Sequence, residues 1–422
     1  MLSPLAILPL LLIVLRRGAS AVQTSSRDPI SLPLLRKIHN TGGRVADRDR
    51  RRTQAFQSPN HRPAAPKAIS PRSPGNVQAA NAIVTYTVDV DIGYPNTTYT
   101  LLIDTGSANT WVGNDKPFTS TSAKPDLEHP GTDITVYGSG TFAGLNVVDE
   151  VRFTPNLVVH DQGIAVSVPG APQGFPEGMD GILGIGPVAL TRGTVTANRS
   201  STVPTVVDNL YTQGSISSYE IGIYYEPTTV EGSVNGVLTF GGVDQTKFKG
   251  AIQYTSITST APASLYWGID MSVSYGSEIL PQTAGIVDTG TTLVLLASDA
   301  LHEYQKSTGA VLDKPTGLLR ITEAQFCNLK PLVLHIGGRA FTMTPDAQVF
   351  PRVLNTDLGG EPDALYLVVG DLGSSSGQGL DFIAGYTFLE RFYSVYDTGN
   401  SRVGIAETWF TTKAVNFPEA RC

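Results

Sequence analysis

Three observations predict a mainly β fold made of two related lobes. The 422-residue chain holds 43 Gly and 28 Pro with only 16% charged residues, a composition typical of short strands joined by tight turns. Segments of alternating apolar and polar residues start at Ala82 and recur at short spacing. An Asp-Thr-Gly element followed by Ser or Thr occurs once in each half of the chain. This repeat indicates two similar lobes that each supply one carboxylate.

The first two predicted strands cover residues 82–92 and 97–104 and flank a Gly-Tyr-Pro-Asn turn at residues 93–96. Helical segments are few, and the best candidates lie at residues 205–214 and 297–309. The other strand-like segments are 133–144, 146–160, 236–243, 251–257, 265–273, 332–343 and 364–370. Strands therefore dominate the predicted fold.

The internal repeat extends beyond the tripeptides. Residues 101–112 (LLIDTGSANTWV) are similar to residues 285–297 (GIVDTGTTLVLLA), and each is an apolar run that leads into an Asp-Thr-Gly. A second apolar element that ends in glycine follows in each half, at Gly184 in DGILGIG and at Gly385 in DFIAGYTF. Each predicted lobe thus contains both kinds of element.

The charge distribution divides the chain. An apolar run within residues 1–21 predicts a secretory signal peptide, with an uncleaved membrane anchor as the alternative. Residues 22–75 contain 11 Lys and Arg against 3 Asp and Glu, whereas residues 76–422 contain 17 against 34. The basic segment is a disordered linker, a nucleic-acid-binding tail or a propeptide, and a preceding signal peptide favours the propeptide. The body is expected to form an N-terminal lobe at 76–260 and a C-terminal lobe at 261–422.

The paired aspartates indicate acid-base chemistry. Two carboxyl groups that meet at a lobe interface would share one proton, because two ionised carboxylates repel each other. Such a pair can activate water and protonate a leaving group, so no metal and no cofactor are expected. The motifs of serine hydrolases, zinc proteases and phosphate loops do not occur, and the six His are scattered. Because glycoside hydrolases also use paired carboxylates, the chemistry alone leaves peptides and glycosides open as substrates.

An ordered series of motifs resembles the pepsin-like aspartic endopeptidases, and in particular the fungal polyporopepsin-like group. The motifs cover roughly residues 80–408 and are LLIDTGSANTWVG, ITVYGSGTFAG, DGILGIG, LTFGGVD, YWGIDM, GIVDTGTTL and FIAGYTFLERFYSVYDTGNSRVGIA. The resemblance implies a bilobal pepsin-like acid protease fold with the active-site cleft between two β lobes. It also implies hydrolysis of peptide bonds of proteins at acid pH by a water activated between two aspartates.

The resemblance implies roles for the residues at matching positions. Asp104 and Asp288 match the catalytic pair. The residues that match its support are Thr105, Gly106, Ser107, Thr289, Gly290 and Thr291. The residues that match the substrate-binding flap and the tryptophan behind it are Tyr137, Gly138, Ser139 and Trp111. A structural interpretation of Tyr137 as a strand aromatic and of Trp111 as a core residue stays open.

A third Asp-Thr-Gly, at residues 397–399, has different surroundings. It lies between two alternating segments and is followed by Asn400, where the other two copies have Ser or Thr. We expect a hairpin turn in which Asp397 caps the turn and Gly399 or Asn400 has a positive φ. Asp397 is therefore expected to be dispensable for catalysis.

Two covalent features stay open at this level. Cys327 and Cys422 are the chain's two cysteines, and they either form a disulfide or remain a buried thiol and a loose terminal thiol. A bridge would close a loop of about 95 residues and stabilise the fold by up to about 4 to 5 kcal/mol on the chain-entropy model. Asn96 and Asn198 lie in Asn-x-Thr/Ser sequons, which carry glycans or are unmodified.

The leading hypothesis is a secreted, self-inhibited zymogen of an acid endopeptidase, with the vacuole as the alternative location. Lys and Arg of residues 22–75, such as Lys67, would pair with acidic groups of the cleft until acid weakens the attraction. The expected partners are polypeptide substrates, the chain's own propeptide and pepstatin-type inhibitors. We expect a monomer with no nucleic-acid partner and no stable membrane span after processing. The alternative function is a catalytically inactive pepsin-like binding or inhibitor protein.

Overall fold

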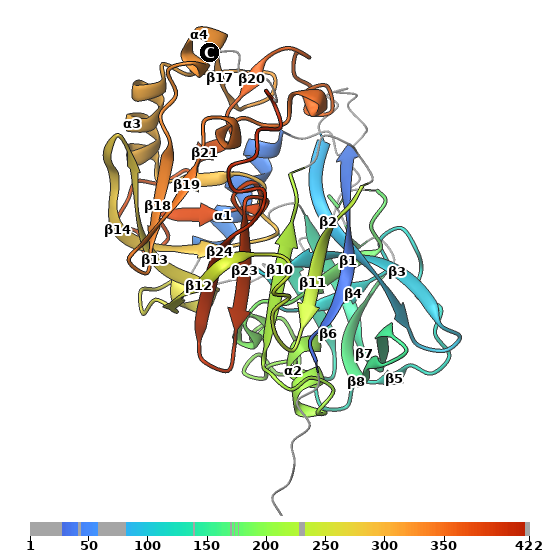
Figure 1. Cartoon of the computed structure of the whole chain (residues 1–422). Coiled ribbons are helices and arrows are strands. Elements are labelled where there is room, and N and C mark those ends of the chain that lie inside the picture. The colour runs from blue at the N-terminus through green and yellow to red at the C-terminus, as the bar shows by residue number, and fades with distance from the viewer. Residues whose placement is uncertain are drawn as a thin grey trace, which may run out of the picture.

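The computed structural model describes residues 28–40, 44–57, 82–137, 140–168, 171–172, 174–175, 177–227 and 233–417. In that part of the chain the fold is mainly β, as the sequence predicts, and Figure 1 shows two β-rich lobes. The segment predicted as a signal peptide lies outside the described residues. The same holds for Lys67, Gly138, Ser139 and Cys422.

The largest sheet has 14 strands and contains both the first and the last strand of the described residues. Its strand order is β12-β24-β23-β10-β11-β1-β2-β3-β9-β4-β8-β7-β5, and β6 pairs with β7. The strands are β1 (Ile30–Asn40), β2 (Ala82–Ile92), β3 (Thr97–Asp104), β4 (Thr110–Val112), β5 (Lys124–Pro125), β6 (Thr132–Val136), β7 (Thr141–Thr154), β8 (Leu157–Ser167), β9 (Gly181–Gly184), β10 (Glu220–Tyr225), β11 (Val234–Phe240), β12 (Lys249–Ser256), β23 (Phe392–Asp397) and β24 (Arg402–Glu407).

A 7-stranded sheet forms the second lobe, in the order β19-β18-β13-β14-β22-β15-β21, and a small sheet has the order β16-β17-β20. The strands are β13 (Gly268–Tyr275), β14 (Ser277–Val287), β15 (Val294–Leu296), β16 (Val311–Leu312), β17 (Leu319–Ile321), β18 (Leu332–Ile336), β19 (Arg339–Met343), β20 (Leu365–Tyr366), β21 (Val369–Asp371) and β22 (Phe382–Ala384).

Helices are short, and the two that the sequence predicts are present. The α-helices are α1 (Val45–Gln57), α2 (Val206–Thr212), α3 (Ser298–Thr308), α4 (Glu323–Phe326) and α5 (Tyr386–Leu389). The 3-10 turns are Val188–Thr191, Ala263–Leu265, Asp346–Gln348 and Arg352–Leu354. Thr205 begins α2 through a capping box with Asp208, and Gly309 ends α3 in the left-handed conformation with φ 69°.

The same local topology occurs in both lobes. Strand β3 pairs in parallel with β9, so that Asp104 lies opposite Gly184. Strand β14 pairs in parallel with β22, so that Val287 lies opposite Ala384. A short strand then pairs antiparallel with the second strand of each parallel pair: β4 pairs with β9 in one lobe, and β15 pairs with β22 in the other. This arrangement agrees with the internal repeat in the sequence and places each Asp-Thr-Gly at the end of a buried strand.

The third Asp-Thr-Gly forms the predicted hairpin, between β23 and β24. Asp397 Oδ1 accepts a hydrogen bond from the Asn400 amide at 3.0 Å, and Asp397 Oδ2 accepts one from Arg402 Nε at 2.6 Å. The positive φ, 50°, is at Ser401, so its prediction at Gly399 or Asn400 is wrong. The Asp397 carboxylate caps the turn as predicted, and the left-handed residue follows Asn400.

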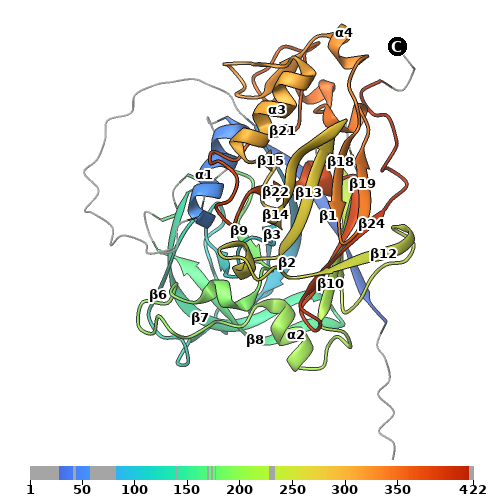
Figure 2. The same cartoon turned by 90° about the vertical axis from the view of Figure 1, so that its left-hand side faces the viewer.

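The N-terminal basic segment folds onto the body. Strand β1 lies between β11 and β2 and is antiparallel to both. Helix α1 follows β1 and lies between the lobes in both Figure 1 and Figure 2. The described residues of segment 22–75 therefore contribute one strand to the largest sheet and one helix to the space between the lobes.

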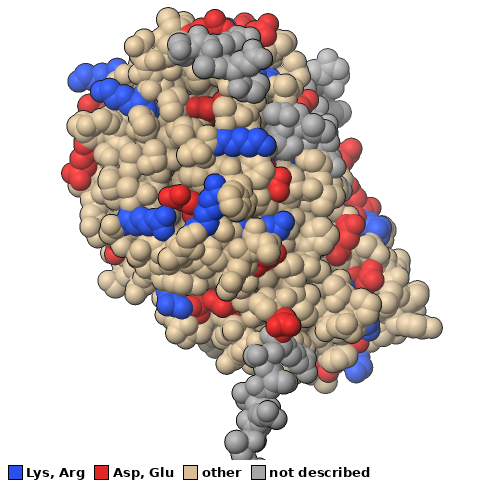
Figure 3. Space-filling view, viewed as in Figure 1, with Lys and Arg blue, Asp and Glu red and all other residues tan. Residues whose placement is uncertain are grey.

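Cys327 is disulfide-bonded. Because Cys422 lies outside the described residues, its pairing with Cys327 stays a prediction. In the described part of the chain, no helix combines the length and apolar character needed to cross a membrane. Figure 3 shows acidic and basic side chains interspersed on one face of the molecule, separated by wide uncharged areas.

Candidate active site

Asp104 lies fully buried at the end of β3. Its Oδ1 accepts a hydrogen bond from the Gly106 amide at 2.9 Å, and its Oδ2 accepts one from Ser107 Oγ at 2.6 Å. The Ile185 amide donates to the Asp104 carbonyl at 2.9 Å and ties the loop after β9 to the same strand. Two donors therefore fix the orientation of this buried carboxylate.

Asp288 has the matching set of contacts in the other lobe. It is fully buried, its Oδ1 accepts from the Gly290 amide at 3.1 Å, and its Oδ2 accepts from Thr291 Oγ1 at 2.6 Å. Its own amide donates to the Ala384 carbonyl at 3.1 Å. We call Asp104 and Asp288 the aspartate pair.

Two threonines connect the lobes beneath the aspartate pair. The Thr105 amide donates to Thr289 Oγ1 at 3.0 Å, and the Thr289 amide donates to Thr105 Oγ1 at 2.9 Å. Each hydroxyl also donates to a carbonyl across the interface, to Val287 at 3.4 Å and to Ile103 at 3.0 Å. This reciprocal contact fixes one Asp-Thr-Gly relative to the other.

The glycines of the two elements permit the close approach of the carboxylates. A Cβ added at Gly106 would lie 2.6 Å from Asp288 Oδ1, and a Cβ added at Gly290 would lie 2.6 Å from Asp104 Oδ1. Each glycine thus faces the carboxylate of the opposite lobe. A side chain at either glycine position would push that carboxylate away. The structure brings together the aspartate pair and its six predicted supporting residues.

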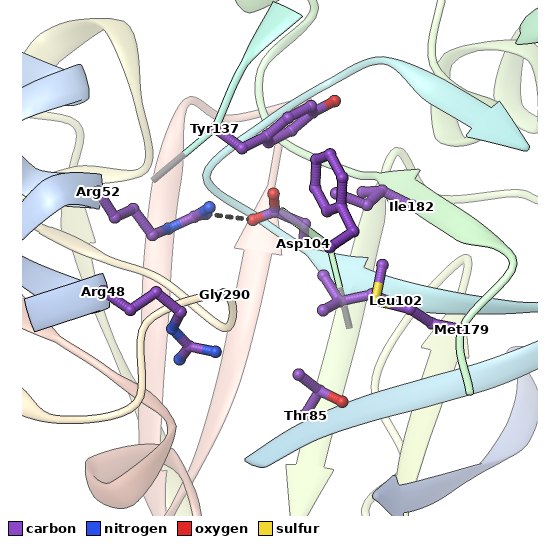
Figure 4. A pocket seen from close by; sticks show the side chains of 10 residues that line it. Arg48, Arg52, Thr85, Leu102, Asp104, Tyr137, Met179, Ile182 and Gly290 are labelled. Carbon is purple, nitrogen blue, oxygen red and sulfur yellow. Dashed lines mark hydrogen bonds and ion pairs between the residues drawn. The ribbon is translucent and has the colours of Figure 1, made fainter. Parts of the chain in front are cut away.

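Arg52 of α1 binds both carboxylates of the aspartate pair. Its Nε donates to Asp288 Oδ2 at 2.7 Å, and its Nη2 donates to Asp288 Oδ1 at 3.0 Å. The same Nη2 also donates to Asp104 Oδ1, the contact drawn in Figure 4. One guanidinium nitrogen therefore lies between the two inner carboxylate oxygens. The ring of Phe56, one turn along α1, packs 4.8 Å from Arg52 Cζ.

The electrostatics of this cluster favour charged groups. Burial alone would raise the pKa of Asp288, but the charge and hydrogen bond of Arg52, with the donors at Thr291 and Gly290, outweigh it and lower that pKa below 3.8. Burial would lower the pKa of Arg52, and the two carboxylates outweigh burial and raise it. The cluster is thus a buried cation held by two carboxylates.

Helix α1 also binds the backbone amides of two residues that follow Asp288. Asp49 is fully buried, and its Oδ2 accepts from the amides of Thr292 and Leu293 at 3.0 and 2.9 Å. Arg48 Nη2 donates to Thr292 Oγ1 at 2.5 Å and to Asp49 Oδ1 at 3.0 Å. Burial raises the pKa of Asp49, although Arg48 and the two amides partly oppose the shift.

The predicted flap is a hairpin of β6 and β7, and Tyr137 and Gly140 pair next to its turn. The Tyr137 amide donates to the Gly140 carbonyl at 2.7 Å. The Tyr137 ring packs against Phe175 with centroids 5.4 Å apart, and Trp111 contacts both rings at centroid distances of 4.9 to 6.3 Å. Trp111 is fully buried in this cluster, so the role of a core residue and the place behind the flap tyrosine hold together.

A small cavity lies between this aromatic cluster, Asp104 and α1. Figure 4 shows Arg52 reaching across it from α1 toward Asp104, with Tyr137 on the side of the flap. The residues that line it are Arg48, Arg52, Thr85, Leu102, Asp104, Tyr137, Phe175, Met179, Ile182 and Gly290. Its wall is apolar on the side of the N-terminal lobe and cationic on the side of α1.

Asp133 is a buried carboxylate at the start of the flap hairpin. Thr135 Oγ1 donates to it at 2.9 Å and Thr194 Oγ1 at 3.3 Å, and the Asn109 amide group also donates to it. Burial raises the pKa of Asp133 from 3.8 to about 6, because these neutral donors offset only part of the desolvation. The structure around the flap therefore favours the protonated acid.

Asp133→Asn is expected to flatten the pH dependence of stability. Since the folded-state pKa is raised, the stability linked to Asp133 is fully present below about 3.8 and is lost as pH rises through about 6. Between pH 4 and pH 7 the parent should lose about 2 kcal/mol of unfolding free energy that the variant keeps. Urea unfolding at both pH values, in an Asp104→Asn background that prevents self-digestion, measures the difference. Asp161→Asn, at an exposed aspartate, is the control, and parallel pH profiles of Asp133→Asn and parent would contradict the prediction.

Both sequon asparagines are at the surface. Asn96 is exposed in the turn between β2 and β3, and Asn198 is exposed and accepts hydrogen bonds from the Ser200 amide and hydroxyl through its Oδ1. An exposed side chain is accessible to a glycosyltransferase, and modification of either residue stays a prediction.

Sequence reasoning missed Arg52 and proposed Lys67 as an example of a basic residue that binds the cleft. The run RDRRR at residues 48–52 reads as a solvated charge cluster, since it has no apolar periodicity of its own. The available signal was the spacing of Val45, Asp49, Arg52 and Phe56, which places them on one face of a helix. Those four side chains are all buried.

Comparisons with known proteins identify the family. The family model of eukaryotic aspartyl proteases matches residues 85–408. Polyporopepsin of Irpex lacteus is 53% identical over 344 residues, which cover 81% of this chain and 99% of the relative. Cathepsin E of Rattus norvegicus is 29% identical over 341 residues, with 75% of this chain and 78% of the relative covered.

A solved structure is similar as well. The crystal structure of an aspartic proteinase from Irpex lacteus superimposes with a TM-score of 0.76 at 52% identity and covers 79% of this chain and 96% of that one. The family match, the sequence identity and the shared fold agree with one another. The chain therefore belongs to the eukaryotic aspartyl protease family and is a pepsin-like aspartic endopeptidase.

Proposed function

We propose that this endopeptidase is made as a self-inhibited zymogen that becomes active in acid. The single observation that carries the proposal is the position of Arg52, whose Nη2 contacts the inner oxygens of both Asp104 and Asp288. Arg52 comes from segment 22–75, the basic segment for which the sequence predicts a propeptide. A cation between the two carboxylates blocks the place where both could reach one water molecule.

The catalytic chemistry follows from the symmetry of the aspartate pair. Once Arg52 has left, two buried carboxyl groups that face each other share one proton, because two ionised groups at this distance repel. The ionised member takes a proton from water as the water attacks the peptide carbonyl, and the protonated member donates to the substrate. The donors at Gly106, Ser107, Gly290 and Thr291 hold the four oxygens in place. The complete set of groups disfavours the inactive binding protein.

Segment 22–75 is held to the body by its strand as well as its helix. Arg36 of β1 is fully buried, and its Nη2 lies 3.7 Å from Glu390 Oε1, which also accepts a hydrogen bond from Tyr86 Oη at 2.9 Å. Together with the charge difference between segment 22–75 and the rest of the chain, these contacts support an intramolecular inhibitor.

The direction of the pH response comes from the aspartate pair. Because Arg52 lowers the pKa of Asp288, the binding free energy of this contact is present above 3.8 and is lost as pH falls through the lowered pKa. Asp49 has the opposite sign: its raised pKa favours docking of α1 when the group is protonated. Acid release of α1 is therefore assigned to the aspartate pair rather than to Asp49.

The test is conversion of the purified full-length chain. At neutral pH we expect an intact protein without activity. As the pH is lowered stepwise below the ordinary Asp pKa of about 3.8, we expect progressive loss of the N-terminal segment and a gain of pepstatin-sensitive hydrolysis of unfolded protein. Mass spectrometry and the assay follow both over time. An intact, inactive protein from neutral to acid pH, beside an active chain that begins at Asn76, would show that self-activation is wrong.

Secretion and glycosylation complete the proposal. The predicted signal peptide and the two exposed sequon asparagines support an extracellular enzyme, and the vacuole is the alternative location. N-terminal sequencing of the natural protein would identify the mature first residue, and peptide mapping would show whether Asn96 and Asn198 carry glycans.

A further inference from the structure

A second basic side chain of α1 contacts the 7-stranded sheet of the second lobe. Arg50 Nη2 donates to Asp371 Oδ2 at 3.1 Å, at the end of β21. The side chain of Arg50 is 39% exposed and that of Asp371 is 31% exposed with α1 in place. Asp371 is therefore partly exposed beside α1, and the departure of α1 would leave its carboxylate open to another ligand.

The Asp371 carboxylate is oriented before it meets Arg50. Its Oδ1 accepts a hydrogen bond from Ser298 Oγ at 2.6 Å and one from the Gly373 amide at 2.9 Å. Strand β21 pairs in parallel with β15, and Asp371 lies opposite Leu296. This pairing fixes the backbone that carries Asp371. The second oxygen is thereby left directed at the guanidinium of Arg50. A carboxylate held in this way can bind a cation without first being ordered.

The side chain of Arg50 packs against a glycine. Gly373 has φ 93°, and a Cβ added there would lie 3.0 Å from Arg50 Cγ and 3.2 Å from Arg50 Cδ. The aliphatic stem of Arg50 thus lies along backbone that carries no side chain, and its charged end reaches Asp371. A long basic side chain, with an apolar stem and a cationic tip, fits both parts of the contact.

We propose that Asp371, Ser298 and Gly373 form a substrate subsite that selects a Lys or Arg side chain and that Arg50 occupies it in the zymogen. The proposal rests on the proposed function, in which α1 takes the place of substrate. Arg50 is two residues from Arg52, which contacts the aspartate pair, so the selected residue lies within about four positions of the scissile bond for an extended peptide. Asp371 is thus a specificity residue of the known reaction.

The experiment uses processed enzyme and a mixture of peptides whose cleavage sites are read by mass spectrometry. Parent enzyme is expected to enrich Lys and Arg at one position near the scissile bond. Two matched peptides with Lys or Gln at that position then give the ratio of kcat/KM values. Asp371→Asn should lower this ratio by about three- to tenfold, mainly through KM, because the contact contributes to binding. Asp161→Asn, at an exposed aspartate on β8, is the matched control.

Two further measurements separate selection by charge from a change of fold. The Lys/Gln ratio of parent enzyme should fall as salt is added, since screening weakens an exposed ion pair. Asp371→Lys should invert the preference and favour Glu over Lys at the same position. Absence of a basic preference in parent enzyme, or an unchanged ratio in Asp371→Asn, overturns the subsite. Failure of the acid-treated parent to cleave any peptide would instead overturn the proposed function.

Discussion

Asp104→Asn and Asp288→Asn are each expected to lower kcat/KM of the processed enzyme by about 10⁴-fold or more. An amide can neither take a proton from water nor share one with the opposite carboxylate. The substitution is nearly isosteric, and each side chain is fully buried between a backbone amide and a hydroxyl, so the geometry is kept while the chemistry is removed. Hydrolysis of unfolded protein at acid pH measures the effect.

The chain provides its own control in the third Asp-Thr-Gly. Asp397 accepts hydrogen bonds from Asn400 and Arg402 in a hairpin, and Asp397→Asn is expected to keep the activity per folded molecule. Because the variants of the aspartate pair cannot process themselves, added parent enzyme with a removable tag should process all three before the assay. Equal loss in Asp397→Asn, or retained activity in Asp104→Asn or Asp288→Asn, would refute the assignment.

Much of the aspartate pair could be predicted because its signals are local. The apolar run before Asp104 and Asp288 predicts a buried strand, and the glycine two residues later predicts close backbone approach. In the structure each glycine faces the opposite carboxylate, as Gly106 does with Asp288. The strands, the turn at residues 93–96 and the helices α2 and α3 likewise follow from short patterns of alternation, turn residues and caps. Short-range physics was sufficient for these elements.

The contacts that the sequence did not predict are of two kinds. They either join segments that are far apart in the chain or bury a charged residue that is expected in solvent. Thr105 and Thr289 exchange hydrogen bonds across 184 positions, and no local pattern specifies that register. Arg52 is charged, so helix propensity and charge patterning place it in solvent, whereas its partners bury it. Asp133 has the spacing of an ordinary strand residue, and its burial depends on how β6 packs against the lobe. Each of these depends on tertiary packing.

Arg52→Gln in the full-length chain is expected to abolish most of the latency. The substitution leaves two buried carboxylates without their cation, and breaking one side of a buried ion pair costs about 3 to 5 kcal/mol. Asp288 would lose the partner that lowers its pKa, so the aspartate pair would take up a proton at a higher pH. The open form, with α1 displaced, should rise by about 10²- to 5 × 10³-fold. Pepstatin binding to unprocessed chain at neutral pH measures this population, since α1 and the inhibitor compete for the aspartate pair.

Two substitutions on the same helix test whether the effect belongs to the contact. Arg51→Gln makes the same charge change at an exposed position of α1 and should keep the unprocessed chain latent. Arg52→Lys retains a cation but lacks the planar fork that reaches Asp104 and both oxygens of Asp288, so its pepstatin affinity should lie between those of parent and Arg52→Gln. Equal gains in Arg51→Gln and Arg52→Gln would mean that the total charge of the segment holds it in place. The order parent, Arg52→Lys, Arg52→Gln would show that bridging of the two carboxylates does so, because only that mechanism depends on the shape of the cation.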